Sequence, residues 1–179
     1  GDNIVEQHIH NLDVANWVLG GPPKEVFASG GRVWKKDPIY GDLWDHFDCD
    51  YTYDVDGREV HVFSMSRHWD GCDGGVFEQA IGTKDVKMCH HLGERGTNPY
   101  VQEHIDLVKS VTGEGPHLHE GERVAESTLT AIMGRMSAYT GKRLTWEDAM
   151  KSDLSIVPEE WSFEKEYPVG PVPNPVDKA

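Results

Sequence analysis

Residues 45–67 constrain the fold of this chain more than any other stretch. Between Asp45 and Val55, the apolar residues Phe47, Cys49, Tyr51, Tyr53 and Val55 alternate with Asp48, Asp50, Thr52 and Asp54. A period of two is typical of a β-strand with one buried face. Asp56-Gly57 is a two-residue hairpin signal, which predicts that Arg58 to Arg67 returns as the partner strand. One face of this sheet must therefore meet a core, and the other meets water or a partner.

Strands and helices surround this hairpin in an order typical of an α+β domain. Strands are predicted at residues 25–34, 76–81 and 85–89, with a loop at 35–43 and helices at 98–111 and 120–140. A capping box at Thr145 to Asp148 predicts a short last helix. We predict a largely antiparallel open β-sheet with helices packed on one face, formed by residues 1–158. Residues 159–179 are rich in proline and are predicted to be an extended tail without regular structure.

The two longer helices have apolar sides that the periodicity identifies. On helix 98–111, which Asn98 and Pro99 should open, Ile105 and Val108 are the predicted buried side. On helix 120–140 we interpret the apolar stripe as core, not as a cofactor site. The stripe contains Val124, Leu129, Ile132, Met133, Met136 and Tyr139.

Composition excludes some partners. The formal net charge is −14, and the chain has no basic cluster beyond Lys35-Lys36, so a nucleic-acid partner is not expected. No apolar run approaches the ~20 residues of a membrane-spanning helix, so no membrane partner is expected. The three cysteines form no C-x-x-C pair and predict neither a disulfide framework nor a zinc site.

The first helix carries the strongest candidate for chemistry. The spacing of Val5, Ile9, Leu12 and Leu19 predicts a helix from Asn3 to the Gly20-Gly21-Pro22-Pro23 stop. On it, Glu6 and His10 are four residues apart and Asp13 is three further on, so the three side chains should share one face. A carboxylate one turn from a histidine can fix its tautomer and raise its basicity, which suits proton transfer with a hydroxyl. His8 should point elsewhere.

Spacing alone leaves two other interpretations of this helix open. The first is an ordinary helix with an acidic first turn and His10 satisfied in the core. The second is a metal site formed by Glu6, His10 and Asp13, for which no further ligand cluster stands at diagnostic spacing.

The chain resembles the C-terminal domain of the glucose-fructose oxidoreductase / inositol dehydrogenase (Gfo/Idh/MocA) family. In EQHIHNLDVANWVLG, an acidic residue is followed at the family's spacing by His, Asp, an aromatic residue and Gly. PPKEVFASGG, NPYVQEHIDLVKSV and EGERVAESTLTAIMGRMSAYTGKRLTW resemble the family's first C-terminal strand, substrate-side helix and long packing helix. The resemblance covers residues 1 to about 158 and is closest to a bacterial subgroup with the phrases DHF, SMSR and NPYVQEH. The segment 84–97 does not match.

The resemblance implies residue roles. His10 falls on the catalytic His, Glu6 on the position of the catalytic Asp of inositol dehydrogenases, and Asp13 on the Asp of the same helix. Glu6 departs from the pattern because its side chain is one methylene longer. The resemblance implies an NAD(P)-dependent oxidoreductase acting on a sugar, cyclitol or polyol. NAD or NADP would be bound mainly by an N-terminal Rossmann domain, which would also supply a catalytic Lys.

That Rossmann domain is not found in this sequence, which has no G-x-G-x-x-G turn. We therefore expect a fragment of a longer enzyme, inactive alone, with its own Rossmann domain as a partner. The fragment should also form a homo-oligomer through the open sheet face. The cytoplasm is the default expectation for its location, and the periplasm is the alternative, because any signal peptide would lie in the missing part.

Four further residues are candidates for substrate binding. His46 and Arg67 flank the hairpin strands in phrases shared with the subgroup and could bind sugar hydroxyls; alternatively they are strand-end polar residues. Tyr100 and His104 are four apart on the helix that borders the family's substrate pocket; alternatively they are ordinary packing and surface residues. His90-His91 is interpreted as a loop pair and not as a metal site, because adjacent side chains point apart.

Two alternatives to a dehydrogenase remain. The same site could oxidise a sugar carbon only transiently, so that a glycosidic bond is cleaved or a centre is epimerised without net redox. The domain could instead be a non-catalytic assembly module that uses only its open sheet.

Overall fold

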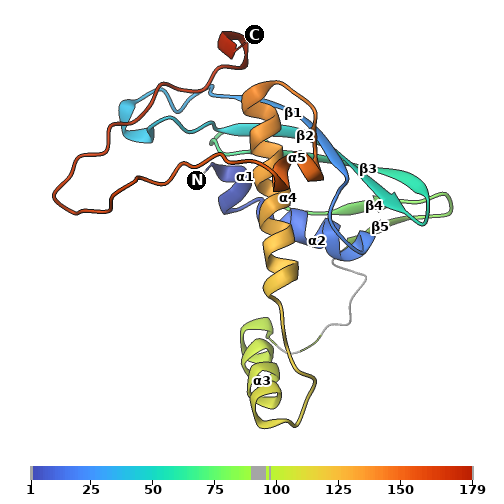
Figure 1. The fold of residues 1–179 in the computed structure, drawn as a ribbon. Coiled ribbons are helices and arrows are strands. Elements are labelled where there is room, and N and C mark those ends of the chain that lie inside the picture. The colour runs from blue at the N-terminus through green and yellow to red at the C-terminus, as the bar shows by residue number, and fades with distance from the viewer. Residues whose placement is uncertain (1, 90–95, 97, 179) are drawn as a thin grey trace.

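The computed structural model describes residues 2–89, 96 and 98–178. Its main sheet has the strand order β3-β2-β1-β6, and neighbouring strands are antiparallel (Figure 1). The strands are β1 (Glu25–Gly31), β2 (His46–Val55), β3 (Arg58–Arg67) and β6 (Leu144–Thr145). Asp56 and Gly57 both have positive φ, 53° and 74°, as a two-residue type I′ turn requires. The predicted hairpin is confirmed, while β1 ends three residues earlier than predicted.

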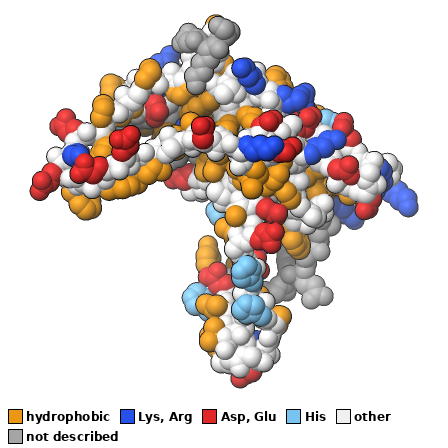
Figure 2. Space-filling view, in the orientation of Figure 1, with side chains coloured by type: hydrophobic (Ala, Val, Ile, Leu, Met, Phe, Trp, Pro, Cys, Tyr) orange, Lys and Arg blue, Asp and Glu red, His pale blue; other side chains and the backbone are white. Residues whose placement is uncertain are grey.

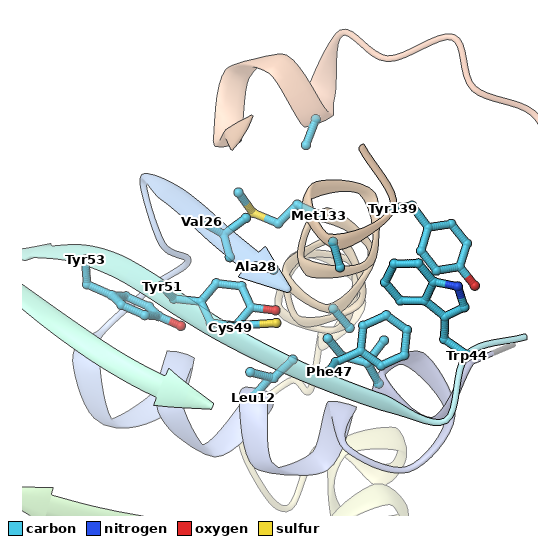
Figure 3. Close-up of a cluster of buried hydrophobic side chains, with 14 residues drawn as sticks. Leu12, Val26, Ala28, Trp44, Phe47, Cys49, Tyr51, Tyr53, Met133 and Tyr139 are labelled. Carbon is cyan, nitrogen blue, oxygen red and sulfur yellow. The ribbon is translucent and has the colours of Figure 1, made fainter. Parts of the chain in front are cut away.

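The helices that pack on the sheet cover one of its faces. They are α1 (Asn3–Glu6), α2 (Ile9–Leu19) and the long α4 (Gly121–Thr140), followed by the short α5 (Trp146–Met150). Figure 3 shows the core between α4 and the inward side chains of β2, with Phe47 and Tyr51 fully buried. The indole of Trp44 and the ring of Tyr139 close one end of this core, with centroids 4.5 Å apart. The predicted α+β fold is confirmed.

The buried side of α4 consists mainly of small residues, which corrects the predicted apolar stripe. Val124 is 51 % exposed, whereas Ser127, Thr130, Ala131, Met133, Gly134, Ser137, Ala138 and Tyr139 are buried. The reason is the close approach of β2. The hydroxyl of Tyr51 donates to the carbonyl oxygen of Thr130 at 3.0 Å, and a Cβ atom on Gly134 would overlap that hydroxyl.

The segment 71–89 forms a second, two-stranded sheet of β4 (Gln79–Ile81) and β5 (Val86–Met88). Both strands are shorter than predicted. A 3-10 turn, η1 (Pro38–Tyr40), lies in the predicted loop before β2. Cys49, Cys72 and Cys89 are free thiols. None of the described helices is both long and apolar enough to span a membrane.

Helix α3 (Pro99–Thr112) lies apart from the sheet, beyond the N-terminal end of α4 (Figure 1). Its start is as predicted, because the side chain of Asn98 accepts a hydrogen bond from the amide of Tyr100 and Pro99 is the first residue. The predicted burial of Ile105 and Val108 is wrong: they are 38 % and 60 % exposed, and no residue of α3 is buried. The physical reason is that no described element covers the apolar side. In Figure 2, hydrophobic side chains are exposed on this projecting part, among histidine and other polar side chains.

The tail is extended over most of its length and returns to the domain at its end. The carbonyl oxygen of Pro173 accepts a hydrogen bond of 3.1 Å from the Trp44 indole. The last described residues form a 3-10 turn, η3 (Pro175–Lys178), so the prediction of no regular structure fails there. Pro175 lies next to Gly141, which ends α4.

Candidate functional site

The candidate site helix is broken at Gln7 and His8, between α1 and α2, which corrects the single predicted helix. At the break, the His8 side chain turns toward the sheet, and its Nε2 lies 2.6 Å from the hydroxyl oxygen of Ser64 on β3. Burial lowers the pKa of the His8 imidazole, an effect that the nearby Glu78 carboxylate and the Asn11 side chain oppose only in part. The neutral imidazole therefore fixes the junction between the two helical segments.

Three further polar side chains fix α2 to its surroundings. The amide of Asn11 donates to the carboxylate of Glu78, in the segment before β4. Asp13 is bound by Arg123 and Ser127 of α4. The buried Asn16 donates to Thr130 and accepts a 2.8 Å hydrogen bond from the Tyr53 hydroxyl. Helix α2 is thus held on several sides, which fixes its rotation as well as its position.

Glu6 and His10, the predicted catalytic pair, flank the break and are both exposed. The interpretation that His10 is satisfied in the core is therefore wrong. Neither side chain makes a hydrogen bond or ion pair with another of the described residues. In particular, Glu6 and His10 are not bonded to each other. The described part of the chain contains no group of three or more potential ligands arranged to hold a metal ion.

Asp13 lies on α2 with His10, but its carboxylate has protein partners. Arg123 donates from one amino nitrogen to both carboxylate oxygens, at 2.7 and 2.8 Å, and the Ser127 hydroxyl donates at 2.6 Å. Asp13 therefore joins α2 to α4.

His46 and Arg67 lie opposite each other on β2 and β3. The alternation of side chains places them on the sheet face opposite to the buried Phe47, away from the helices. The Nδ1 atom of His46 lies 2.9 Å from the buried Asp45 carboxylate, and Arg67 lies over the Trp69 ring at 5.8 Å. The sheet therefore separates this pair from Glu6 and His10.

Tyr100 and His104 form a third, separate group on the projecting α3. His104 Nδ1 lies 2.7 Å from the carbonyl oxygen of Tyr100, and both side chains are exposed. The seven predicted site residues thus fall into three places. Glu6, His10 and Asp13 lie on α1 and α2, His46 and Arg67 on the open sheet face, and Tyr100 and His104 on α3. The pair His90-His91 lies outside the described residues.

Sequence reasoning missed the residues that hold and border the first-helix site. His8, Ser64 and Glu78 have no spacing signal because they come from three different elements. Trp17 is 62 % exposed and borders a surface hollow with Asp13, Val14, Glu120 and Arg123. The sequence signal that could have identified Trp17 is its spacing of four residues from Asp13, which places both on one side of the helix.

Solved structures of several dehydrogenases share this fold. The myo-inositol dehydrogenase of Corynebacterium glutamicum is 19% identical, with a TM-score of 0.57, and the match covers 82% of this chain and 50% of that one. The myo-inositol 2-dehydrogenase of Lactobacillus plantarum is 13% identical, with a TM-score of 0.51 and coverages of 81% and 48%. The scyllo-inositol dehydrogenase of Lactobacillus casei, solved with NAD(H) and scyllo-inositol, is 12% identical, with a TM-score of 0.50 and coverages of 81% and 48%.

The chain spans about half the length of each of these proteins. No model of a protein family matches the sequence, and no curated protein matches it. The chain therefore has the fold of one half of inositol dehydrogenases and related oxidoreductases of the Gfo/Idh/MocA type, the fold that its sequence resemblance implies.

Proposed function

We propose that this chain is the substrate-binding and catalytic half of an NAD(P)-dependent oxidoreductase that acts on a hydroxyl group of a sugar, cyclitol or polyol. The observation that carries the proposal is the position of His10. Its imidazole is exposed and unpartnered among the described residues, on a helix whose rotation is fixed by His8, Asn11 and Asp13. The fold shared with inositol dehydrogenases supports the same assignment.

In this mechanism His10 acts as the general base. A bound nicotinamide would accept the hydride from the carbon atom of the alcohol. The imidazole of His10 takes the hydroxyl proton, and the C–O bond becomes a carbonyl as hydride and proton leave. Glu6 lies across the helix break and makes no hydrogen bond to the His10 ring; its proposed role is to stabilise the imidazolium through its negative charge.

The cofactor would be held mainly by a separate Rossmann domain, because this chain carries no glycine-rich turn for the phosphates. Either NAD or NADP fits this proposal. The chain alone should therefore transfer no hydride. The exposure of Glu6 and His10 is consistent with a site completed by another domain.

The test is a steady-state assay of the complete enzyme with NAD or NADP and a panel of sugars and cyclitols. Absorbance of the reduced nicotinamide is followed together with product analysis. His10→Ala should lower kcat by about 10²- to 10⁴-fold, whereas His117→Ala, an exposed histidine outside the site, should not. Equal activity of the two variants would refute the role of His10. Product without net cofactor reduction would identify the transient-redox alternative.

A second proposal concerns the sheet face that the helices leave open. Phe27, Phe63 and Met65 are 48 %, 77 % and 75 % exposed there, which is unusual for a face that meets only water. The Asp50 carboxylate lies 2.8 Å from Nδ1 of His61 beside them, so the face also carries polar groups. Such a face can pair with its own copy about a two-fold axis, and we propose it as the homo-oligomer interface. His46 and Arg67 belong to this face.

A further inference from the structure

The hollow between α2 and the first turn of α4 is a candidate binding site that differs from the His10 position. Its lining combines one large apolar surface with charged groups: Asp13, Val14, Trp17, Glu120 and Arg123. The Trp17 indole is 62 % exposed and packs against no ring of another described residue. The hollow is shallow and open to solvent, so it can bind one face of a ligand but not enclose it.

The polar groups of the hollow are held in place before any ligand arrives. Arg123 binds both oxygens of Asp13 and, through Nε, an oxygen of Glu120 at 2.6 Å. The Ser127 hydroxyl donates a hydrogen bond of 2.6 Å to the Asp13 carboxylate. The second amino group of Arg123 donates no hydrogen bond to another described residue, and the other oxygen of Glu120 accepts none from one. One donor group and one acceptor therefore remain for a ligand.

The charges select the class of ligand. Two carboxylates and one guanidinium leave the hollow with an excess of negative charge, which disfavours phosphate or carboxylate ligands. A neutral sugar ring fits better. The C–H groups on one side of such a ring can pack on the indole, and its hydroxyls can bond to Arg123 and Glu120.

The distance from His10 indicates which part of a substrate would lie here. Trp17 is seven residues beyond His10 in the same helix, which corresponds to two turns, or about 10 Å along the axis. A single sugar ring in the hollow would not place its hydroxyl at His10. We propose that the hollow binds the sugar unit next to the one that reacts, so that the substrate is a glycoside or oligosaccharide. This inference rests on the proposed function.

A purely structural role of the ion pairs does not account for the hollow. Exposed ion pairs contribute only about 0.2–1 kcal/mol, and the Asp13–Arg123 pair has side chains 35 % and 46 % exposed. The ion pairs alone would need no large indole beside them. The exposed indole of Trp17 is the large apolar surface that the ion pairs do not require, which makes Trp17 the informative residue.

The first experiment measures binding to the 179-residue chain by NMR of its indole N–H groups. The Trp17 resonance is assigned from its loss in Trp17→Phe, and the chain is titrated with cellobiose, maltose, lactose and glucose 6-phosphate. We expect one of the neutral disaccharides to shift the Trp17 resonance, and glucose 6-phosphate to leave it in place. Trp17→Ala should weaken that binding by about tenfold or more, equivalent to about 1.4 kcal/mol. Trp161→Ala, another exposed tryptophan, should not. No shift with any neutral disaccharide overturns the proposal.

The second experiment separates this proposal from the proposed function. In the complete enzyme, Trp17→Ala should raise KM for the disaccharide about tenfold more than it raises KM for the corresponding monosaccharide. Trp17→Phe should raise KM for the disaccharide less than Trp17→Ala does. If Trp17→Ala changes KM equally for both substrates while activity still depends on His10, sugar binding in the hollow is refuted and the proposed function is not. If sugar binds at Trp17 but the complete enzyme transfers no hydride, the proposed function is refuted and sugar binding in the hollow is retained.

Discussion

The fully buried Asp45 offers the sharpest test of what holds the sheet edge together. One of its oxygens accepts hydrogen bonds from the amides of Val33, Trp34 and Lys35 at 2.8, 2.9 and 3.2 Å. The other lies 2.9 Å from Nδ1 of His46. A single carboxylate thus organises the turn after β1 and the first residue of β2, so its removal should leave four donors without their acceptor.

The expected cost follows from these four bonds. Removing one partner of a buried, hydrogen-bonded charge typically costs about 3–5 kcal/mol. Val33 and Trp34 are 54 % and 42 % exposed, so water can reach part of the turn, and we expect about 3 kcal/mol for Asp45→Ala. Asp45→Asn keeps one acceptor oxygen and should cost about 1–2 kcal/mol. Urea unfolding followed by far-UV circular dichroism measures both values. Asp48→Ala, at an exposed position of β2 three residues further on, is the control and should stay within about 0.5 kcal/mol.

The pH dependence of this stabilisation has a defined sign. Burial raises the pKa of the Asp45 carboxyl, but the hydrogen bonds from His46 and the three amides outweigh it, so the pKa lies below its ordinary value of 3.8. A lowered pKa in the folded state stabilises the protein above the unfolded-state value, and this contribution is lost as pH falls through the folded-state value. The difference in unfolding free energy between wild type and Asp45→Asn should therefore be constant near neutral pH and shrink below about pH 4. An Asp45→Ala cost no larger than that of Asp48→Ala would refute the reasoning.

Two further predictions concern the core and the open face. Gly134→Ala should destabilise the fold by about 1–3 kcal/mol, because its Cβ would overlap the Tyr51 hydroxyl; urea unfolding measures this, Gly74→Ala in open space is the control, and equal stabilities would contradict it. Phe63→Lys should lower the oligomeric state measured by light scattering, because it places a charge in the apolar part of the proposed interface. Ile39→Lys, at an 84 % exposed position outside the sheet, is the matched control, and an unchanged oligomer in Phe63→Lys would exclude this face as the interface.

The sheet hairpin and the ends of the helices could be predicted because their signals are local. Strand alternation in β2, the Asp56-Gly57 turn, Asn98 and the Thr145 capping box each depend on neighbours within a few residues. The burial of α4 could not be predicted in the same way. Periodicity identifies its large apolar residues, but the depth of packing depends on Tyr51, which comes from a strand about 80 residues earlier.

The grouping of site residues failed for a related reason. The residues of the first helix and of α3 were predicted from spacing within one element, and His46 and Arg67 from phrases shared with the family subgroup. Neither signal reports which face of the sheet an element occupies. His46 and Arg67 are cross-strand partners, yet strand parity places them on the face away from His10. Tyr100 and His104 share a helix that projects from the domain. The sequence could identify the residues of the first helix together only because they are local to it.

The contacts of α2 explain why an exposed histidine on this helix can be held accurately. An apolar stripe alone would allow a helix to rotate or slide by small amounts, since dispersion contacts are non-directional. Here the directional bonds of His8 to Ser64, Asn11 to Glu78 and Asp13 to Arg123 point to three different elements. A rotation of α2 would break at least one of them. His10 is exposed on this helix, one turn before Asp13, so the same contacts that stabilise the helix also limit where its candidate base points.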